Sequence, residues 1–491
     1  MTPDDLSTFI ADCAESALAE HGKDSSALPP TVVIERPRNP EHGDYTTNLA
    51  LQMATTLGEP PRDVAGWVAD KLAAEPAIQT VDVAGSGFVN IRIDAAAQGD
   101  VVGHILAHGH RYGRGTEFNG TELTLEFRSA NPTRPIHLDD TRHIAVGDAL
   151  ARILAFRGAH LTREYSFNDH DTQIDRFTQS LVASALGQPP PNDEYNGAYI
   201  RDIATSIIHR HPAATTLPEA QRHDIFRREG LALMRTHITT TLHEFGTDFD
   251  TVIHDNSQNT IDHGHHPRMY IRGADHRDPT AATQPQGYDS THVEIIHGNR
   301  VTLIRNGNAV TTSTRTKTTV TLDDLVEFIG VDAARYALIR TPVDQPLDID
   351  VNLWARHTTD NPIVHVQHAH ARLCSLARHA DTAGITATNP NYALLTTRHE
   401  GTLIRTLGEF PSVVESSARR REPHRIARYV EKLAATFHRF YGSGHILPTA
   451  SEPTGDDAAP LVRTRLALAQ ATRHTITNAC QLLGVTAPER M

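Results

Sequence analysis

Residues 125–140 read LEFRSANPTRPIHLDD, and this stretch decides the fold that we expect for the chain. At its beginning, residues 121–127 (TELTLEF) alternate polar and apolar side chains, the pattern of a half-buried strand. Residues 143–157 (HIAVGDALARILAFR) then repeat apolar side chains at helical spacing and end at Gly158. A strand, a proline-containing turn and a helix N-terminus together make an anion site, because backbone N–H groups and the helix dipole both point toward the ligand.

Two carboxylates, Asp139 and Asp140, lie where such an anion would bind. Each contact between like charges near 4 Å costs roughly 1 kcal/mol in water and up to about 4 kcal/mol at an effective dielectric constant near 20. A triphosphate carries several negative charges, so we expect this helix end to repel it. A second interpretation is that the two side chains are N-caps, which stabilise a helix by about 1 kcal/mol and leave the repulsion in place.

The stretch resembles the ATP-binding signature of class I aminoacyl-tRNA synthetases, and its flanks, LEF-SANP and GDALARIL, are close to those of arginyl-tRNA synthetases. The family reads P-T-G-P-L-H-V-G-H here, with a small residue and a second His where this chain has Asp139 and Asp140. The resemblance extends to the terminal LLGVTAPERM. It implies an α/β fold, with a class I Rossmann-like core between an N-terminal α/β domain and a C-terminal all-α domain of the anticodon-binding type.

Three domains are expected along the 491 residues. Residues 1–116 resemble the N-terminal domain of arginyl-tRNA synthetases, including its HGDYTTNLALQMA run. Residues 117–356 are expected to form the degenerate Rossmann-like core, with a polar, helix-rich insertion at about 176–246. Residues 357–491 read as amphipathic helices, as in an anticodon-binding domain.

The two terminal domains hold the residues expected to contact tRNA. In the family the N-terminal domain contacts the D-loop, and Phe88 and Asn90 match the part that binds an unpaired base. An aromatic face beside an amide suits single-stranded RNA, although Phe88 could equally be strand core and Asn90 a turn residue. In the helical domain, the donors and positive charges expected to contact the RNA are Gln367, His370, Arg372, Arg428, His438 and Arg439.

Two further departures from the family fall on amino-acid activation. The mobile loop that resembles K-M-S-K-R in the family reads TTSTR at residues 311–315, and losing a lysine that stabilises developing phosphate charge typically costs a few kcal/mol. The stretch that recognises the arginine guanidinium is reduced to residues 259–269. Its carboxylate, the natural bidentate partner of a guanidinium, is therefore missing.

These losses predict a protein that binds tRNA but does not form an aminoacyl-adenylate. The first hypothesis is an aminoacyl-tRNA-dependent aminoacyltransferase, which moves an amino acid such as leucine from charged tRNA to a small-molecule amine. This resembles the role of synthetase-derived enzymes in peptidyl-nucleoside antibiotic biosynthesis. The second hypothesis is a non-catalytic, antitoxin-like tRNA-binding regulator, and the third is an atypical arginyl-tRNA synthetase.

Transfer to an amine requires removal of a proton, so a general base with a pKa near 7 would help. The candidate bases are His137, Asp139, Asp140 and His276, and Arg134 is the candidate for polarising the ester carbonyl. His137 could equally hold the loop without a chemical role. The remaining substrate-binding candidates are Glu126, Ser129, Asn131, Gly273 and Asp275.

Composition and residue spacing limit which other partners and sites the chain is expected to have. The formal net charge of −13 does not exclude RNA binding, which needs only a local basic face. No stretch is apolar enough to span a membrane, and the three cysteines show neither zinc nor disulfide spacing. The histidines at 263, 265 and 266 also lack a metal-motif spacing. We expect a cytoplasmic monomer with no membrane contact, no metal and no cofactor.

Overall fold

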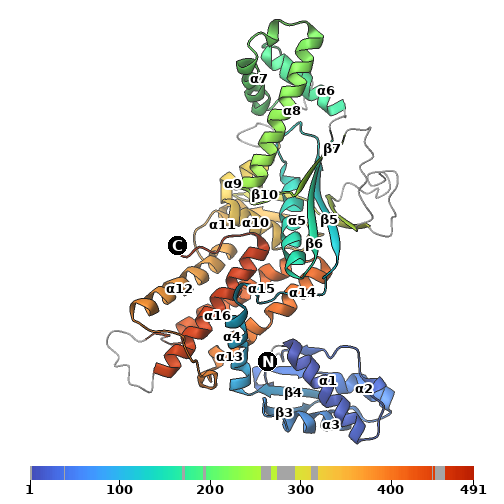
Figure 1. Cartoon of the computed structure of the whole chain (residues 1–491), viewed down its shortest axis with the longest axis vertical. Helices are drawn as coiled ribbons and strands as arrows, with labels where there is room; N and C mark the ends of the chain where they lie inside the picture. Colours follow the sequence, from blue (N-terminus) through green and yellow to red (C-terminus); the bar gives the residue numbers. More distant parts are fainter. Residues whose placement is uncertain are drawn as a thin grey trace.

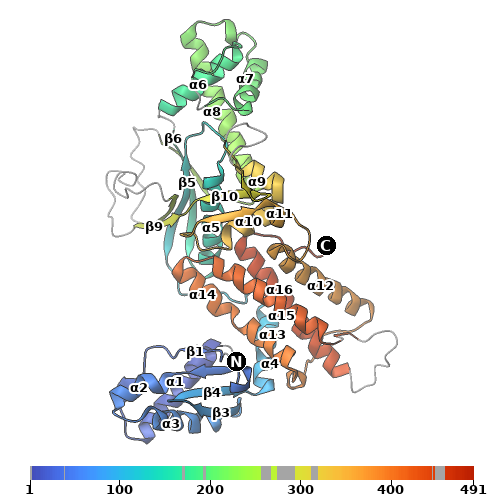
Figure 2. The ribbon, with the colours of Figure 1, turned by 180° about the vertical axis from the view of Figure 1, so that it is seen from behind.

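The computed structural model describes residues 3–37, 39–168, 172–191, 195–255, 267–273, 293–310, 319–444, 446–447 and 459–491. These residues form an elongated molecule, with an N-terminal α/β part at one end and a helical projection at the other (Figure 1). A parallel sheet lies between the two ends, and a bundle of helices packs beside it (Figure 2). The expected α/β class with a C-terminal helical domain is confirmed.

The N-terminal part is an antiparallel sheet covered by helices on one face. Its strands run in the order β1-β2-β4-β3, with bounds β1 (Ile34–Glu35), β2 (Tyr45–Thr47), β3 (Ile78–Ala84) and β4 (Phe88–Ile93). Its helices are α1 (Pro3–Glu20), α2 (Leu49–Leu57) and α3 (Pro61–Ala73). Val89, Ile91 and Ile93 of β4 are buried in this part's own apolar core. Gly85 and Gly87, both with positive φ, form the turn between β3 and β4.

The central sheet has five parallel strands in the order β7-β6-β5-β8-β9. Their bounds are β5 (Glu122–Ala130), β6 (His160–Asn168), β7 (Thr251–Asp255), β8 (Arg268–Gly273) and β9 (Val293–Gly298). Helix α5 (Leu138–Phe156) packs on this sheet through Gly147, where a Cβ atom would lie 2.2 Å from the Phe127 ring. Only glycine fits there, because real Cβ atoms do not approach other heavy atoms so closely.

A smaller sheet and the helical insertion complete this part of the chain. The sheet has the order β11-β10-β12, with β10 (Val301–Arg305), β11 (Asn308–Ala309) and β12 (Leu347–Asp350). The insertion consists of α6 (Thr172–Ala185), α7 (Ala198–Arg210) and α8 (Glu219–Glu244), which project away from the sheet (Figures 1 and 2). Five short 3₁₀ segments are described at 25–27, 40–42, 109–111, 214–216 and 392–394.

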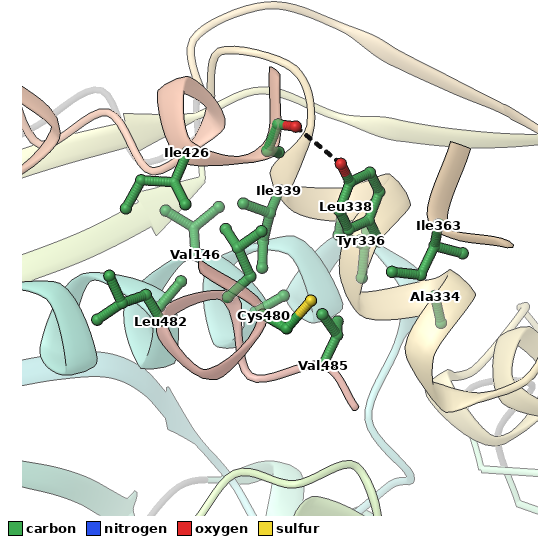
Figure 3. Close-up of a cluster of buried hydrophobic side chains, with 14 of the residues drawn as sticks. Val146, Ala334, Tyr336, Leu338, Ile339, Ile363, Ile426, Cys480, Leu482 and Val485 are labelled. Carbon is green, nitrogen blue, oxygen red and sulfur yellow. Dashed lines mark hydrogen bonds between the residues drawn. The ribbon is translucent and has the colours of Figure 1, made fainter. Parts of the chain in front are cut away.

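The remaining helices form the bundle and its connections to the sheet. They are α4 (Ala95–His108), α9 (Leu322–Ile329), α10 (Val331–Ile339), α11 (Val351–Trp354), α12 (Pro362–Thr382), α13 (Arg398–Gly408), α14 (Phe410–Arg420), α15 (His424–Gly442) and α16 (Ala459–Leu483). One apolar core runs from the central sheet into this bundle. Figure 3 shows its centre, where Val146 of α5 meets Ile339 of α10 and Leu482 of α16.

A buried ion pair joins the sheet to the bundle at this point. Asp148 of α5 and Arg335 of α10 are both fully buried and form a direct ion pair. Arg335 also donates to the carbonyl oxygen of Phe245 at 2.8 Å and to Thr247 Oγ1 at 3.0 Å. Burial lowers the pKa of Arg335, and the Asp148 carboxylate opposes that shift. The pair therefore depends on both members staying together.

We expect Asp148→Asn to lower the free energy of unfolding by about 3–5 kcal/mol, because it leaves an uncompensated guanidinium in the core. Chemical denaturation of the full chain measures the change. Arg228→Gln is the control, since Arg228 is exposed and its ion pairs with Asp224 and Glu229 are on the surface. Its expected cost is under about 1 kcal/mol. Equal destabilisation by the two variants would show that the buried pair is not a central connection.

Candidate functional site

The candidate site begins where β5 ends and α5 starts. The N-cap of α5 is His137, and the helix itself begins at Leu138, before the start at 143 that apolar spacing predicts. Asp139 and Asp140 therefore lie in the first helical turn, so the interpretation of them as N-caps is wrong. Carboxylates in a first turn are still stabilised by the positive end of the helix dipole. They also place negative charge where an anionic ligand would otherwise bind.

His137 contacts the segment that follows the TTSTR loop in the chain. Its Nε2 atom lies 3.1 Å from Thr319 Oγ1, and its backbone forms an isolated bridge with Thr321. The backbone N–H of Leu138 donates to the carbonyl oxygen of Val320 at 2.9 Å. The TTSTR loop at 311–315 lies outside the described residues. The described residues 319–321, which come later in the chain, contact the start of α5.

A small pocket of about 40 Å³ opens beside this helix end. Its lining includes three of the predicted site residues, Asn131, Arg134 and Asp140, together with Thr133, Pro135, Ile136, Tyr165, Gln173 and Ile238. Asn131 Nδ2 donates to Gln173 Oε1 at 2.8 Å, and the Tyr195 hydroxyl lies 3.3 Å from Thr133 Oγ1. A water molecule occupies about 30 Å³ in the liquid, so the pocket holds little more than one.

Glu126 does not line this pocket. It is buried on the sheet with its Oε2 atom 4.0 Å from a guanidinium nitrogen of Arg268, which also pairs directly with Glu164. Burial raises the pKa of Glu164, with Arg268 opposing the shift. The structure therefore gives Glu126 a place in a buried charge cluster within the sheet, apart from the predicted substrate-binding residues around Asn131.

Of the remaining predicted residues, some are described only by their backbone, and the others lie outside the described residues. Ser129 and Gly273 lie near the carboxyl ends of β5 and β8, which are neighbouring parallel strands. Ligands of open α/β sheets bind at that edge. Asp275, His276, the shortened stretch at 259–266 and the histidine cluster at 263–266 lie outside the described residues. Among the residues that are described, no group of three or more His, Cys, Asp or Glu side chains is arranged to hold a metal ion.

The predicted RNA contacts of the N-terminal part differ in exposure. Phe88 is 41% exposed at the start of β4, whereas Asn90 is only 7% exposed. The alternative that Phe88 is strand core is therefore wrong. Its ring is accessible for stacking on a base, and Asn90 offers little surface for a base edge.

The six residues predicted to contact RNA in the helical domain fall into two groups, buried and accessible. Gln367 and His370 are buried, with Gln367 Nε2 donating to Asp332 at 2.7 Å and His370 Nδ1 lying 2.9 Å from the carbonyl oxygen of Pro488. They anchor the C-terminal segment, so we exclude them from the candidate RNA surface. Arg372, Arg428 and Arg439 are exposed, and His438 is half-buried.

A stacked pair gives the helical domain a flat polar face. The guanidinium carbon of Arg372 lies 4.8 Å from the centre of the Tyr441 ring, and Tyr441 is 38% exposed. Arg372 Nη1 is 3.3 Å from His438 Nδ1, and burial lowers the pKa of His438 to about 4. A neutral His438 can accept a hydrogen bond from Arg372. Tyr441 is not among the RNA-contact residues predicted from the sequence, although the run HRFYG at the end of α15 places an aromatic residue there.

Two family models match parts of the chain. The model described as arginyl tRNA synthetase N terminal domain matches residues 6–93, and the model described as DALR anticodon binding domain matches residues 366–491. Both matches fall on the parts expected to bind tRNA.

Solved structures share the fold along most of the chain. A Campylobacter jejuni protein described as an arginyl-tRNA synthetase has a TM-score of 0.70 at 21% identity, covering 81% of this chain and 100% of its own. Thermus thermophilus arginyl-tRNA synthetase has a TM-score of 0.69 at 17% identity, covering 99% and 100%. The Plasmodium falciparum arginyl-tRNA synthetase has a TM-score of 0.67 at 12% identity, covering 100% of both chains.

The fold is that of a class I aminoacyl-tRNA synthetase with a C-terminal helical anticodon-binding domain. The family models at the two ends of the chain support a place in the arginyl-tRNA synthetase family. Among the described residues, no helix combines the length and apolar character needed to cross a membrane.

We expect the double variant Asp139→Asn, Asp140→Asn to bind ATP at least about tenfold more tightly than the wild type, because two like-charge contacts of roughly 1 kcal/mol each are removed. Isothermal titration of the full chain with MgATP measures this. The variant Asp202→Asn is the control, since Asp202 lies on α7 of the insertion, and it should leave the affinity unchanged. An unchanged ATP affinity in the double variant would show that the carboxylates do not oppose nucleotide binding.

Proposed function

We propose that this protein is an aminoacyl-tRNA-dependent aminoacyltransferase, which takes an amino acid such as leucine from charged tRNA and passes it to a small-molecule amine. The observation that carries the proposal is the pair of carboxylates in the first turn of α5, within a fold whose two ends match tRNA-synthetase domains. The scaffold for tRNA is kept, and the helix end that would bind triphosphate is negatively charged. The energy for amide formation would then come from the ester of charged tRNA.

The chemistry needs no nucleotide. The amine nitrogen attacks the ester carbonyl carbon, a C–N bond forms, and the C–O bond to the terminal ribose breaks. The amine loses one proton to a base, and the ribose oxygen gains one as it leaves. Asp140, which lines the pocket, and His137, at the N-cap of α5, are the candidate bases. Arg134 is exposed at the same pocket and is the candidate for polarising the carbonyl.

Two surfaces support tRNA as the partner. Phe88 presents an accessible ring on the N-terminal part, and the Arg372–Tyr441 stack presents a second platform on the helical domain. Stacking on an aromatic side chain contributes about 1–3 kcal/mol per base and does not depend on base identity. The arginines add contacts to the phosphate backbone.

The small pocket favours a second candidate. A space of about 40 Å³ is too small for an aminoacyl group beside an acceptor amine, so the described conformation also suits a tRNA-binding regulator without turnover. An atypical arginyl-tRNA synthetase is the third candidate, and the shared fold is equally consistent with it.

The direct test is single-turnover transfer. tRNA carrying a labelled amino acid is mixed with the full chain and a set of candidate amines, without ATP, and labelled amide is measured. We expect amide formation by the wild type, and a loss of about 10²-fold or more in the Asp139→Asn, Asp140→Asn variant, the order expected for a missing general base. Binding of tRNA, followed by filter binding, should be nearly unchanged.

The outcomes separate the three candidates. Tight tRNA binding with no transfer from any charged tRNA across a broad set of amines would contradict the transferase and favour the regulator. Charging of tRNA from free arginine and ATP would favour the synthetase. Equal transfer by the double variant and the wild type would remove the two carboxylates from the mechanism.

A further inference from the structure

A large cavity lies away from the candidate site, between the N-terminal part and the helical bundle. It has a volume of about 740 Å³. One wall comes from the segment around residues 36–44 and from β4, and the other from the segment at 395–405 that includes α13. This cavity, here called the interdomain cleft, is lined by four arginines and two carboxylates: Arg36, Arg92, Arg398, Arg405, Glu41 and Asp44. It is basic within a chain whose formal net charge is −13.

The floor of the interdomain cleft is fixed by Asp44. Its Oδ2 atom accepts hydrogen bonds from the Ile93 N–H at 3.0 Å and from Gln98 Nε2 at 2.9 Å, and its Oδ1 atom lies 2.7 Å from Arg405. The preceding Gly43 has a φ of +113°, and a Cβ atom there would lie 2.7 Å from the carbonyl oxygen of Ile91. The Gly-Asp pair of the HGDYTTNLALQMA run thus connects β4 to the helical bundle, and the charge of Asp44 is matched by Arg405.

Two of the other arginines, Arg92 and Arg398, keep donors for a ligand. Arg36 is less available, because its Nε atom lies 2.8 Å from Glu409 and its Nη2 atom is buried. Arg92 Nη2 donates to the carbonyl oxygen of Glu41 at 3.3 Å. Arg398 is exposed and forms no ion pair with another described residue. Glu409 is shared with Lys432, at 2.7 Å, so the nearby carboxylates leave an excess of positive charge.

Strand β4 carries both Arg92 of this cleft and the exposed ring of Phe88. Val89, Ile91 and Ile93 are buried in the core, so the alternate residues Phe88 and Arg92 lie on the opposite face of the same strand. At about 3.3 Å per residue, they are roughly 13 Å apart along the strand. Asn90, which lies between them on that face, is only 7% exposed, so the ring and the cleft are two separate contact points on one strand.

We propose that the interdomain cleft binds backbone phosphates of the tRNA, at Arg92 and Arg398, on opposite walls. The inference rests on the proposed tRNA binding and adds a contact between the two parts already matched to tRNA-synthetase domains. A guanidinium donates two parallel hydrogen bonds to a phosphate, which suits these side chains. None of the described residues that line the cleft is aromatic, so these residues offer a base no ring to stack on. That favours a backbone, whose bases can lie outside the cleft, over a free nucleotide.

The test is the salt dependence of tRNA binding by the double variant Arg92→Gln, Arg398→Gln. Each phosphate contact contributes about 0.7–0.9 to the slope of log K against log salt, so loss of two contacts should reduce the slope by about 1.5. Filter binding of a tRNA pool between low and physiological salt gives the slope. The control is Arg201→Gln, Arg228→Gln on the insertion, which removes the same charge from exposed positions and should leave the slope unchanged.

The single variant Arg398→Gln tests whether a folding defect explains a reduced slope. Arg398→Gln removes an exposed side chain without an internal ion pair, so the melting temperature should stay at the wild-type value while the slope falls by about 0.7–0.9. A wild-type slope in both variants, with tRNA bound by the wild type, would overturn the cleft proposal alone. A wild type that binds no tRNA at all would overturn the proposed function as well.

A small phosphorylated ligand is the other occupant to be tested. AMP and inorganic phosphate are titrated into the wild type and into Arg92→Gln, Arg398→Gln. If AMP binds the wild type and not the variant, while both bind tRNA with equal slopes, the cleft is a nucleotide site and the proposal is wrong. Weak or absent AMP binding together with the reduced tRNA slope supports the RNA backbone.

Discussion

The buried ion pair between Asp148 and Arg335 is the constraint on which the rest of the structure depends. Two fully buried charges cost free energy unless each has its partner, so α5 and α10 cannot separate without exposing one of them to an apolar core. The same guanidinium fixes the end of the insertion through Phe245 and Thr247. It also lies against Gly484, where a Cβ atom would be 2.2 Å from Arg335 Nη2. One side chain thus fixes sheet, insertion and C-terminal helix relative to each other.

Arg142, Gly147 and Asp148 hold helix α5 in place, and none of them is a candidate catalytic residue. Arg142 is fully buried and donates to backbone carbonyl oxygens of Asn299, Thr341 and Pro342 at 3.4, 3.3 and 2.7 Å. Gly147 and Asp148 fix the middle of the helix. The first turn also packs, through the buried side chains of Leu138 and Thr141. Asp139 is exposed and Asp140 is half-buried, so the charge of this turn lies on its outer side.

Local patterns predicted the strand, the turn and the helix of the candidate site, and failed where the structure depends on distant residues. Apolar spacing predicts too late a start for α5 because its first turn carries two carboxylates, whereas the hydrogen bond from Leu138 to Val320 holds that turn in place. Gln367 and His370 suit RNA by type, but their burial depends on the C-terminal segment folding back onto α12. The interdomain cleft joins Arg92 to Arg398, and no local pattern brings them together.

The central claim is that this chain binds tRNA without activating an amino acid. The most direct measurement is ATP–pyrophosphate exchange with each of the twenty amino acids, with and without tRNA, on the full chain whose tRNA binding has been verified. The account predicts no exchange above background for any of them, arginine included. Robust exchange with arginine in the presence of tRNA would contradict it, and would mean that the carboxylates of α5 are compatible with a working synthetase.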